Sequence, residues 1–150
     1  MKTNNVLLSA ILVAVLCSGA DLFAESYGGG SGTAALPYEI WDPNQMNTIG
    51  VNPADWGKHF KLMSNIDMSG YAGTSYNIIG KSTSSPFTGT FDGNGHVISN
   101  LSYTTTEVVD YVGLFGVTNN AAILNLALEK VLFSTQTGLV GGLVGLIRTP

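Results

Sequence analysis

Few residues in this chain have the types and spacing that chemistry requires. The segment Asp92-Gly93-Asn94-Gly95 places two oxygen-bearing side chains close together, as at the start of a calcium-binding loop. Such a loop needs further ligands and a distal bidentate glutamate, and none follows at the required spacing. A glycine-rich β-turn explains the same residues, so we predict a turn at Asp92, Gly93, Asn94 and Gly95.

Other reaction chemistry also lacks a recognisable set of residues. His59 and His96 are the only two histidines, no Cys or His pair has zinc-ligand spacing, and no serine lies in a nucleophile elbow. Carboxylates for glycoside hydrolysis would have to meet across the fold. A polysaccharide lyase would need basic residues beside acidic metal ligands. Only five basic residues follow the N-terminal segment: Lys58, Lys61, Lys81, Lys130 and Arg148. The sequence therefore predicts no catalytic residue, no cofactor and no metal.

Four aromatic residues could bind a sugar, because flat aromatic faces stack on the apolar faces of sugar rings. They are Trp41, Trp56, Tyr71 and Tyr76. The alternative is that they pack the first helix and the first long loop, and their position favours this alternative. Glycan binding stays open as a partner class.

The composition is typical of an exported all-β protein. The 150 residues include 19 glycines, only 11% are charged, and the net charge is −4. Frequent glycines indicate many tight turns between short strands. Neither nucleic acid nor an anionic membrane surface is an expected partner, because no basic patch is present.

The N-terminus has the pattern of a secretory signal peptide. An apolar run over residues 6–16 follows Lys2, and it is shorter than the roughly 20 residues that span a bilayer. We predict a signal peptide over 1–24 with cleavage after Ala24 rather than Ala20. Cys17 follows the bulky Leu16, which argues against a lipoprotein, so the mature chain is expected outside the cell or on its surface, with no transmembrane segment and no cysteine.

Two domain segments are expected after cleavage. Residues 25–36 read as a flexible Gly/Ser-rich lead. Residues 37–150 read as an N-terminal cap and the first coils of a stack, with a strand at 37–41 and a short helix that begins at Asp42-Pro43 and ends at Gly50. Alternation over 59–68 predicts a strand with one buried face.

A repeated pattern organises the rest of the chain. In the segment Gly113-Leu114-Phe115-Gly116 two glycines enclose two apolar residues, and we call this pattern a bracket. The bracket recurs as Gly142-Leu143-Val144-Gly145, and residues 77–80 resemble a degenerate forerunner of it. Each bracket follows an Ile-x-Asn-Leu element, at 98–101 and 123–126. Aligning these elements predicts that Ile98 stacks on Ile123 and Leu101 on Leu126. At the asparagine of each element the alternation of apolar and polar residues shifts by one position, which indicates a corner of the chain.

Short strands, corners and glycines at fixed places favour an all-β fold of the right-handed parallel β-helix (solenoid) type with a short N-terminal capping helix. A β-sandwich is the alternative, but its hairpins would not require both patterns to recur in the same order.

The brackets and the segment 87–98 that precedes them resemble bacterial GLUG-motif proteins. The similarity also covers 38–40, the helix and 60–68, and thus nearly all of the mature chain. It implies a secreted or surface-exposed β-helical protein similar to filamentous adhesins, with no single activity attached. This chain has only two brackets, which predicts an N-terminal portion that is incomplete at its C-terminal end.

Two functions stay open. One is a non-catalytic secreted or cell-surface repeat module that interacts with a glycan, the matrix or a surface protein. The other is the N-terminal scaffold of a larger carbohydrate-active enzyme or peptidase whose catalytic part lies beyond residue 150. In both cases the apolar segment 139–147 is expected to expose a strand edge, which predicts self-association through the C-terminal coil.

Overall fold

The computed structural model describes residues 26–136 and 138–149, so the predicted signal peptide lies outside the described residues. Short strands dominate and helix is scarce, which confirms the all-β class. The helical elements are α1 (Pro43–Ile49) and a 3-10 turn, η1 (Pro53–Asp55). The strands are β1 (Tyr38–Ile40), β2 (His59–Leu62), β3 (Ile66–Asp67), β4 (Thr90–Asp92), β5 (Val97–Ser99), β6 (Ser102–Thr104), β7 (Tyr111–Val112), β8 (Phe115–Asn119), β9 (Ala122–Leu124), β10 (Ala127–Glu129), β11 (Leu132–Ser134), β12 (Leu139–Val140) and β13 (Val144–Arg148).

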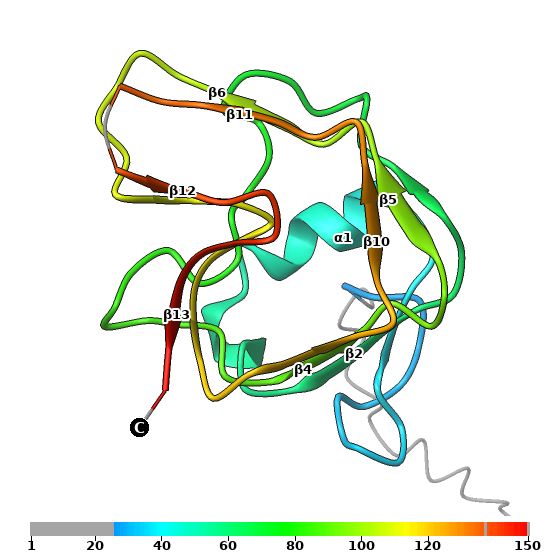
Figure 1. Cartoon of the computed structure of the whole chain (residues 1–150). Coiled ribbons are helices and arrows are strands. Elements are labelled where there is room, and N and C mark those ends of the chain that lie inside the picture. The colour runs from blue at the N-terminus through cyan, green and yellow to red at the C-terminus, as the bar shows by residue number, and fades with distance from the viewer. Residues whose placement is uncertain (1–25, 137, 150) are drawn as a thin grey trace, which may run out of the picture.

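The strands form five small parallel sheets. Their orders are β1-β2-β4-β9, β10-β5-β3, β11-β6, β12-β7 and β13-β8. Within the described residues every pairing of two strands is parallel, so the hairpins that a β-sandwich would contribute are absent there. Figure 1 shows that the chain goes round the molecule repeatedly, and we call each such turn a pass. One pass contains β4 to β8, and the last pass contains β9 to β13, which lie beside β4 to β8 in the same order.

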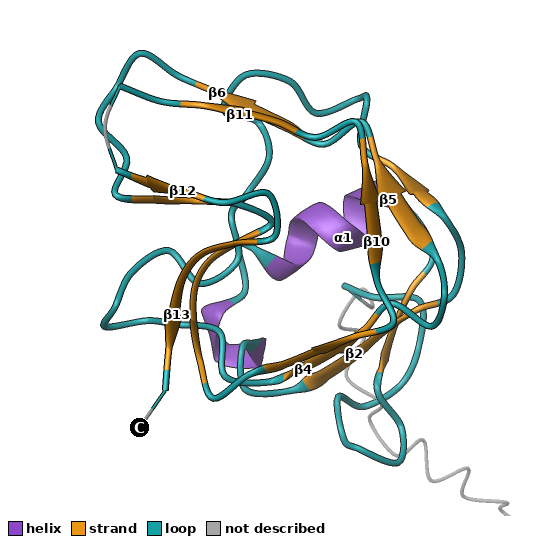
Figure 2. Cartoon of the chain, viewed as in Figure 1, coloured by secondary structure: helices purple, strands orange, loops and turns teal. Residues whose placement is uncertain are grey.

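A short helix forms where the sequence predicts one. The Asp42 side chain accepts a hydrogen bond from the Gln45 N–H at 2.9 Å, and Pro43 occupies the first turn. Met46 and Ile49 are fully buried. Figure 2 shows α1 in the middle of the ring of strands, where it covers the interior of the first pass.

Aromatic rings form the centre of the core. The Phe87 ring lies 5.0 Å from that of Phe115 and 6.2 Å from that of Phe60, measured between centroids. Phe91 contacts Phe115 edge-on at 5.5 Å. These residues come from successive passes, so burial of their side chains holds the passes together.

Part of the segment expected to be a flexible lead is instead packed against β1. Tyr27 is only 5% exposed, and its hydroxyl donates to Asp55 at 3.1 Å. The Gly28 N–H donates to the Glu39 carbonyl and the Glu39 N–H donates to the Gly29 carbonyl, both at 2.9 Å. The glycines suggested flexibility, but they allow this strand-like approach to β1.

The predicted alignment of the two Ile-x-Asn-Leu elements is wrong. Ile98 pairs with Leu128 and Ile66, whereas Ile123 pairs with Phe91. Likewise, the Leu101 carbonyl accepts from the Leu132 N–H, so Leu101 does not stack on Leu126. The two elements occupy different corners of the ring. They resemble each other because both corners place an asparagine in a left-handed turn, and not because they are equivalent positions.

The predicted asparagine corners are confirmed. Asn100 and Asn125, at the predicted corners, have φ values of 55° and 51°. Asn94 in the predicted turn and Asn120, for which no corner was predicted, also have positive φ. Asparagine tolerates this left-handed conformation better than most residues.

Candidate functional site

The glycine brackets lie side by side in two successive passes. Phe115 pairs with Val144, which places Gly116 beside Gly145 and Gly113 beside Gly142. A bridge between Ile79 and Phe115 adds the forerunner at 77–80 as a third level. The structure therefore brings the bracket residues together as one glycine column: Gly80, Gly116 and Gly145.

The glycine column exists because the backbones approach too closely for side chains. A Cβ on Gly116 would lie 2.7 Å from the Gly80 carbonyl oxygen, and one on Gly145 would lie 2.8 Å from the Gly116 carbonyl oxygen. Between the glycines, Leu114 and Phe115 are fully buried. In the last pass the equivalent Leu143 is 38% exposed and Val144 is half-buried, because no further pass covers them in the structure. Leu143 is therefore packed only in part.

The Asp92 turn is held by hydrogen bonds within the protein. One oxygen of Asp92 accepts from the Asn94 N–H at 2.8 Å and from the Asn125 side chain at 3.0 Å. Asn94 and Gly95 have positive φ. In the described part of the chain no group of three or more His, Cys, Asp or Glu side chains could hold a metal ion. The hydrogen bonds of Asp92 therefore support a structural role in forming this corner of the chain.

A second corner repeats the same arrangement. One oxygen of Asp67 accepts from the Asn100 side chain at 2.9 Å and from the Ser69 N–H at 2.9 Å. In both corners the asparagine follows the aspartate by 33 residues and belongs to the next pass. These Asp–Asn corner pairs were missed from the sequence, although an aspartate followed one pass later by a corner asparagine is a signal that could find them.

The corner pairs lower the pKa of their carboxyl groups. The pKa of Asp67 lies below its usual value chiefly because of the Asn100 hydrogen bond, with help from Ser69. Partial desolvation opposes the shift at Asp92, but the Asn94 N–H, the Asn125 side chain and the Lys61 charge together hold its pKa below the usual value.

We expect stability to fall in acid because of these two carboxylates. Their folded-state pKa values lie below those of the unfolded chain, so the unfolded chain takes up protons first as pH falls through about 4. Urea denaturation at pH 7 and pH 3 measures the difference. In Asp92→Asn that difference should shrink, whereas Glu107→Gln, an exposed control, should match the parent; an unchanged pH dependence in Asp92→Asn would contradict the assignment.

The aromatic residues proposed as a sugar platform do not gather on the surface. Trp56 and Tyr76 are buried, which confirms the packing alternative for these two. The Trp56 indole N–H donates to the Ile49 carbonyl at 2.7 Å, and the Tyr76 hydroxyl donates to the Leu114 carbonyl at 2.8 Å. Trp41 is 48% exposed and bonds to Glu39, while the Tyr71 hydroxyl bonds to Asn44.

The two histidines are placed apart from any catalytic set. His59 lies half-buried in β2, and its partner across the sheet is Thr90. The His96 ring nitrogen lies 3.2 Å from the Asn65 side-chain oxygen at a corner. Lys61 is the register partner of Asp92 on β4, and its charge acts to lower the pKa of Asp92.

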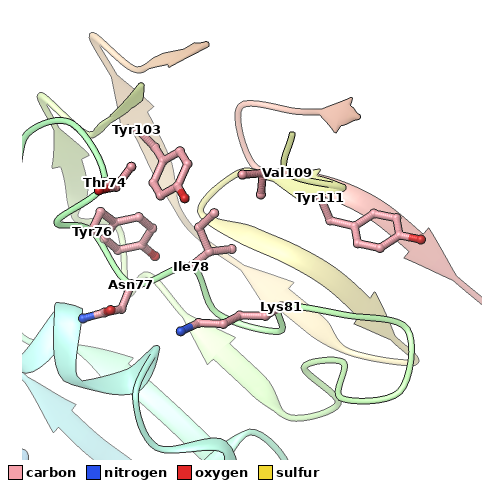
Figure 3. Close-up of a pocket in the computed structure, with 8 residues that line it drawn as sticks. All are labelled: Thr74, Tyr76, Asn77, Ile78, Lys81, Tyr103, Val109 and Tyr111. Carbon is pink, nitrogen blue, oxygen red and sulfur yellow. The ribbon is translucent and has the colours of Figure 1, made fainter. Parts of the chain in front are cut away.

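One pocket brings polar and aromatic side chains from two passes together, and we call it the Lys81 pocket (Figure 3). Its volume is about 190 Å³. It is lined by Thr74, Tyr76, Asn77, Ile78, Lys81, Tyr103, Val109 and Tyr111. Sequence reasoning named Tyr76, Lys81 and the segment 77–80 for other reasons and missed the pocket itself, because segments 74–81 and 103–111 meet only through the stacking of passes.

Comparisons with known proteins give limited similarity. No family model matches the chain. Halomucin from Haloquadratum walsbyi is 36% identical over 109 residues, which is 67% of this chain and 1% of halomucin. A solved structure of a candidate immunoglobulin A1 protease from Bacteroides ovatus is 27% identical, with a TM-score of 0.50 over 68% of this chain and 30% of that one. The chain thus spans a minor part of each protein.

Proposed function

We propose that this chain is part of a secreted or cell-surface repeat module in which parallel passes stack as a right-handed β-helix of the GLUG-motif type. The observation that carries the proposal is the glycine column, in which three bracket levels from successive passes lie in register. Such stacking builds a long, rigid surface by repetition, and its corner loops are free to contact a glycan, the matrix or a surface protein.

The similarity to halomucin supports an extracellular setting. A match that covers 67% of this chain but 1% of halomucin fits a unit that belongs to a far longer protein. The name halomucin denotes a mucin-like protein, and such a relative favours a surface or extracellular setting for this chain. Within the described residues no helix is long and apolar enough to cross a membrane.

The exposed strand edges of the last pass support the proposal that a further coil stacks on it. β9 to β13 each lie at the edge of their sheet, and four of them expose a large apolar residue: Leu124 at 48%, Leu132 at 59%, Leu139 at 49% and Ile147 at 68%. Exposed strand edges with apolar faces recruit further strands. We propose that another coil of the same repeat covers this face, and that without it the chain self-associates there.

Light scattering on the purified chain tests this end of the stack. Concentration-dependent association is expected, and Leu132→Lys with Ile147→Lys should reduce it by placing charge on the edge. Leu36→Lys with Val51→Lys, at exposed positions near the N-terminal end of the described residues, serves as control. A monomer at all concentrations would contradict the open edge.

Secretion tests the proposed setting. Expressed with its leader, the chain is expected in the extracellular or surface fraction with a mature N-terminus near Glu25, which mass spectrometry identifies. Protease treatment of intact cells should remove it while a cytoplasmic marker survives. A full-length, protease-protected chain in the cytoplasm would contradict the proposal.

A larger enzyme or peptidase remains the second candidate, and the similarity to the Bacteroides ovatus protein favours it. In that case this chain is a scaffold and the catalytic part lies beyond residue 150. Sequencing the gene downstream distinguishes the two: further brackets support the repeat module, whereas a domain with a metal or acid/base motif supports the enzyme.

A further inference from the structure

We propose that the Lys81 pocket binds a single sugar ring that carries a carboxylate. This inference rests on the proposed extracellular function and names a ligand class for it. The argument concerns the pocket's rigidity, its size, its free polar groups and its charge.

The pocket walls are fixed by the core. Tyr76 is 1% exposed and is anchored by its hydrogen bond to the Leu114 carbonyl. The neighbouring Asn77 N–H donates to the Asn47 side chain at 2.7 Å. Gly80, just before Lys81, belongs to the glycine column and has a φ of +71°. The residues that present Lys81 are therefore held in place before any ligand arrives.

The size of the pocket suits one ring. Its volume of about 190 Å³ is below the roughly 300–1,000 Å³ of sites for drug-sized ligands. Ile78 and Val109 provide an apolar surface, and the Tyr103 ring stands beside it (Figure 3). A sugar ring has apolar C–H faces and a polar rim, which matches an aromatic and aliphatic wall surrounded by hydrogen-bonding groups.

Five side-chain polar groups of the lining residues have no hydrogen-bond partner among the described residues. The Tyr111 hydroxyl points away from the other lining side chains in Figure 3, which leaves four groups at the pocket. They are the Thr74 hydroxyl, the Asn77 side-chain amide, the Lys81 ammonium and the Tyr103 hydroxyl. In Figure 3 the Lys81 side chain runs beneath Ile78 toward Asn77, and the Tyr103 hydroxyl points to the interior of the group. Together they offer donors and acceptors to the hydroxyls of one ring.

The charge of the pocket selects an anionic ligand. Lys81 is the only charged residue that lines it. Glu107 and Asp110 lie on the neighbouring loop but do not line the pocket, so no carboxylate is placed there to receive an amino sugar. A ligand carboxylate would give Lys81 a charge-assisted hydrogen bond, whereas a neutral sugar would not.

Titration of the secreted chain with D-glucuronate, followed by the assigned amide signals in NMR, tests the proposal. Millimolar affinity is expected, with saturable shifts confined to residues 74–81 and 103–111. D-glucose should bind about fivefold more weakly, as expected for loss of one partly exposed charge interaction. Lys81→Gln should remove the preference for glucuronate, and Lys58→Gln, an exposed lysine elsewhere, should retain it.

Three outcomes would overturn the proposal. One is the absence of saturable shifts at the pocket, and another is equal affinity for D-glucose and D-glucuronate in the parent chain. The third is a preference for D-glucosamine, which would show that the pocket favours a cation. None of these results bears on secretion or on the stacking of passes, so the ligand and the extracellular function are tested separately.

Discussion

Replacing Phe87 with alanine is expected to lower the free energy of unfolding by about 3–5 kcal/mol. Phe87 is fully buried, and its ring contacts that of Phe60 in the same pass and that of Phe115 in the next pass. Removing the ring leaves a cavity between passes that rigid, hydrogen-bonded strands cannot close. Urea denaturation of the purified chain measures the loss.

Phe133→Ala is the matched control for Phe87→Ala. Phe133 lies in β11 of the last pass and is half-buried, so the same substitution removes less buried area there and should cost clearly less. Equal losses at the two positions would contradict the assignment of the core to the earlier passes.

Gly116→Ala is expected to destabilise the protein by about 1–3 kcal/mol, because a new methyl group forces the backbone to shift. The added Cβ would lie 2.7 Å from the Gly80 carbonyl oxygen, 3.0 Å from the Ile78 side chain and 3.0 Å from the Tyr111 carbonyl oxygen. Two of these neighbours are backbone atoms of adjacent segments and cannot rotate away. Thermal and urea denaturation measure the effect.

The second bracket supplies the control for Gly116→Ala. A Cβ on Gly142 would meet only the Val131 side chain, at 3.7 Å, which is ordinary contact. Gly142→Ala is therefore expected to be neutral, or to stabilise by up to about 1 kcal/mol through the unfolded chain. A loss at Gly142 as large as that at Gly116 would mean that the brackets are not packed as described.

Local features of this fold could be predicted from the sequence because local chemistry determines them. Asp42-Pro43 begins α1 whatever the helix packs against. A left-handed corner favours asparagine in any pass, so Asn100 and Asn125 identified corners correctly.

Features that depend on which passes lie side by side could not be predicted. The Ile-x-Asn-Leu elements gave a false register because they lie at different corners: Ile98 pairs with Leu128, whereas Ile123 pairs with Phe91. The Asp–Asn corner pairs and the Lys81 pocket both join residues of different passes, and neither is visible until that register is known.

Cysteine crosslinking tests the register of the stacked passes most directly. With Cys17→Ser in place, the chain has no other cysteine. Ser99 and Glu129 are paired across β5 and β10, and parallel partners about 4.8 Å apart lie within the Cα range of a disulfide. The pair Ser99→Cys with Glu129→Cys should therefore crosslink on oxidation, and Ser99→Cys with Leu124→Cys, the pair implied by the repeated sequence elements, should not. The reverse result would contradict the stacked arrangement described for this protein.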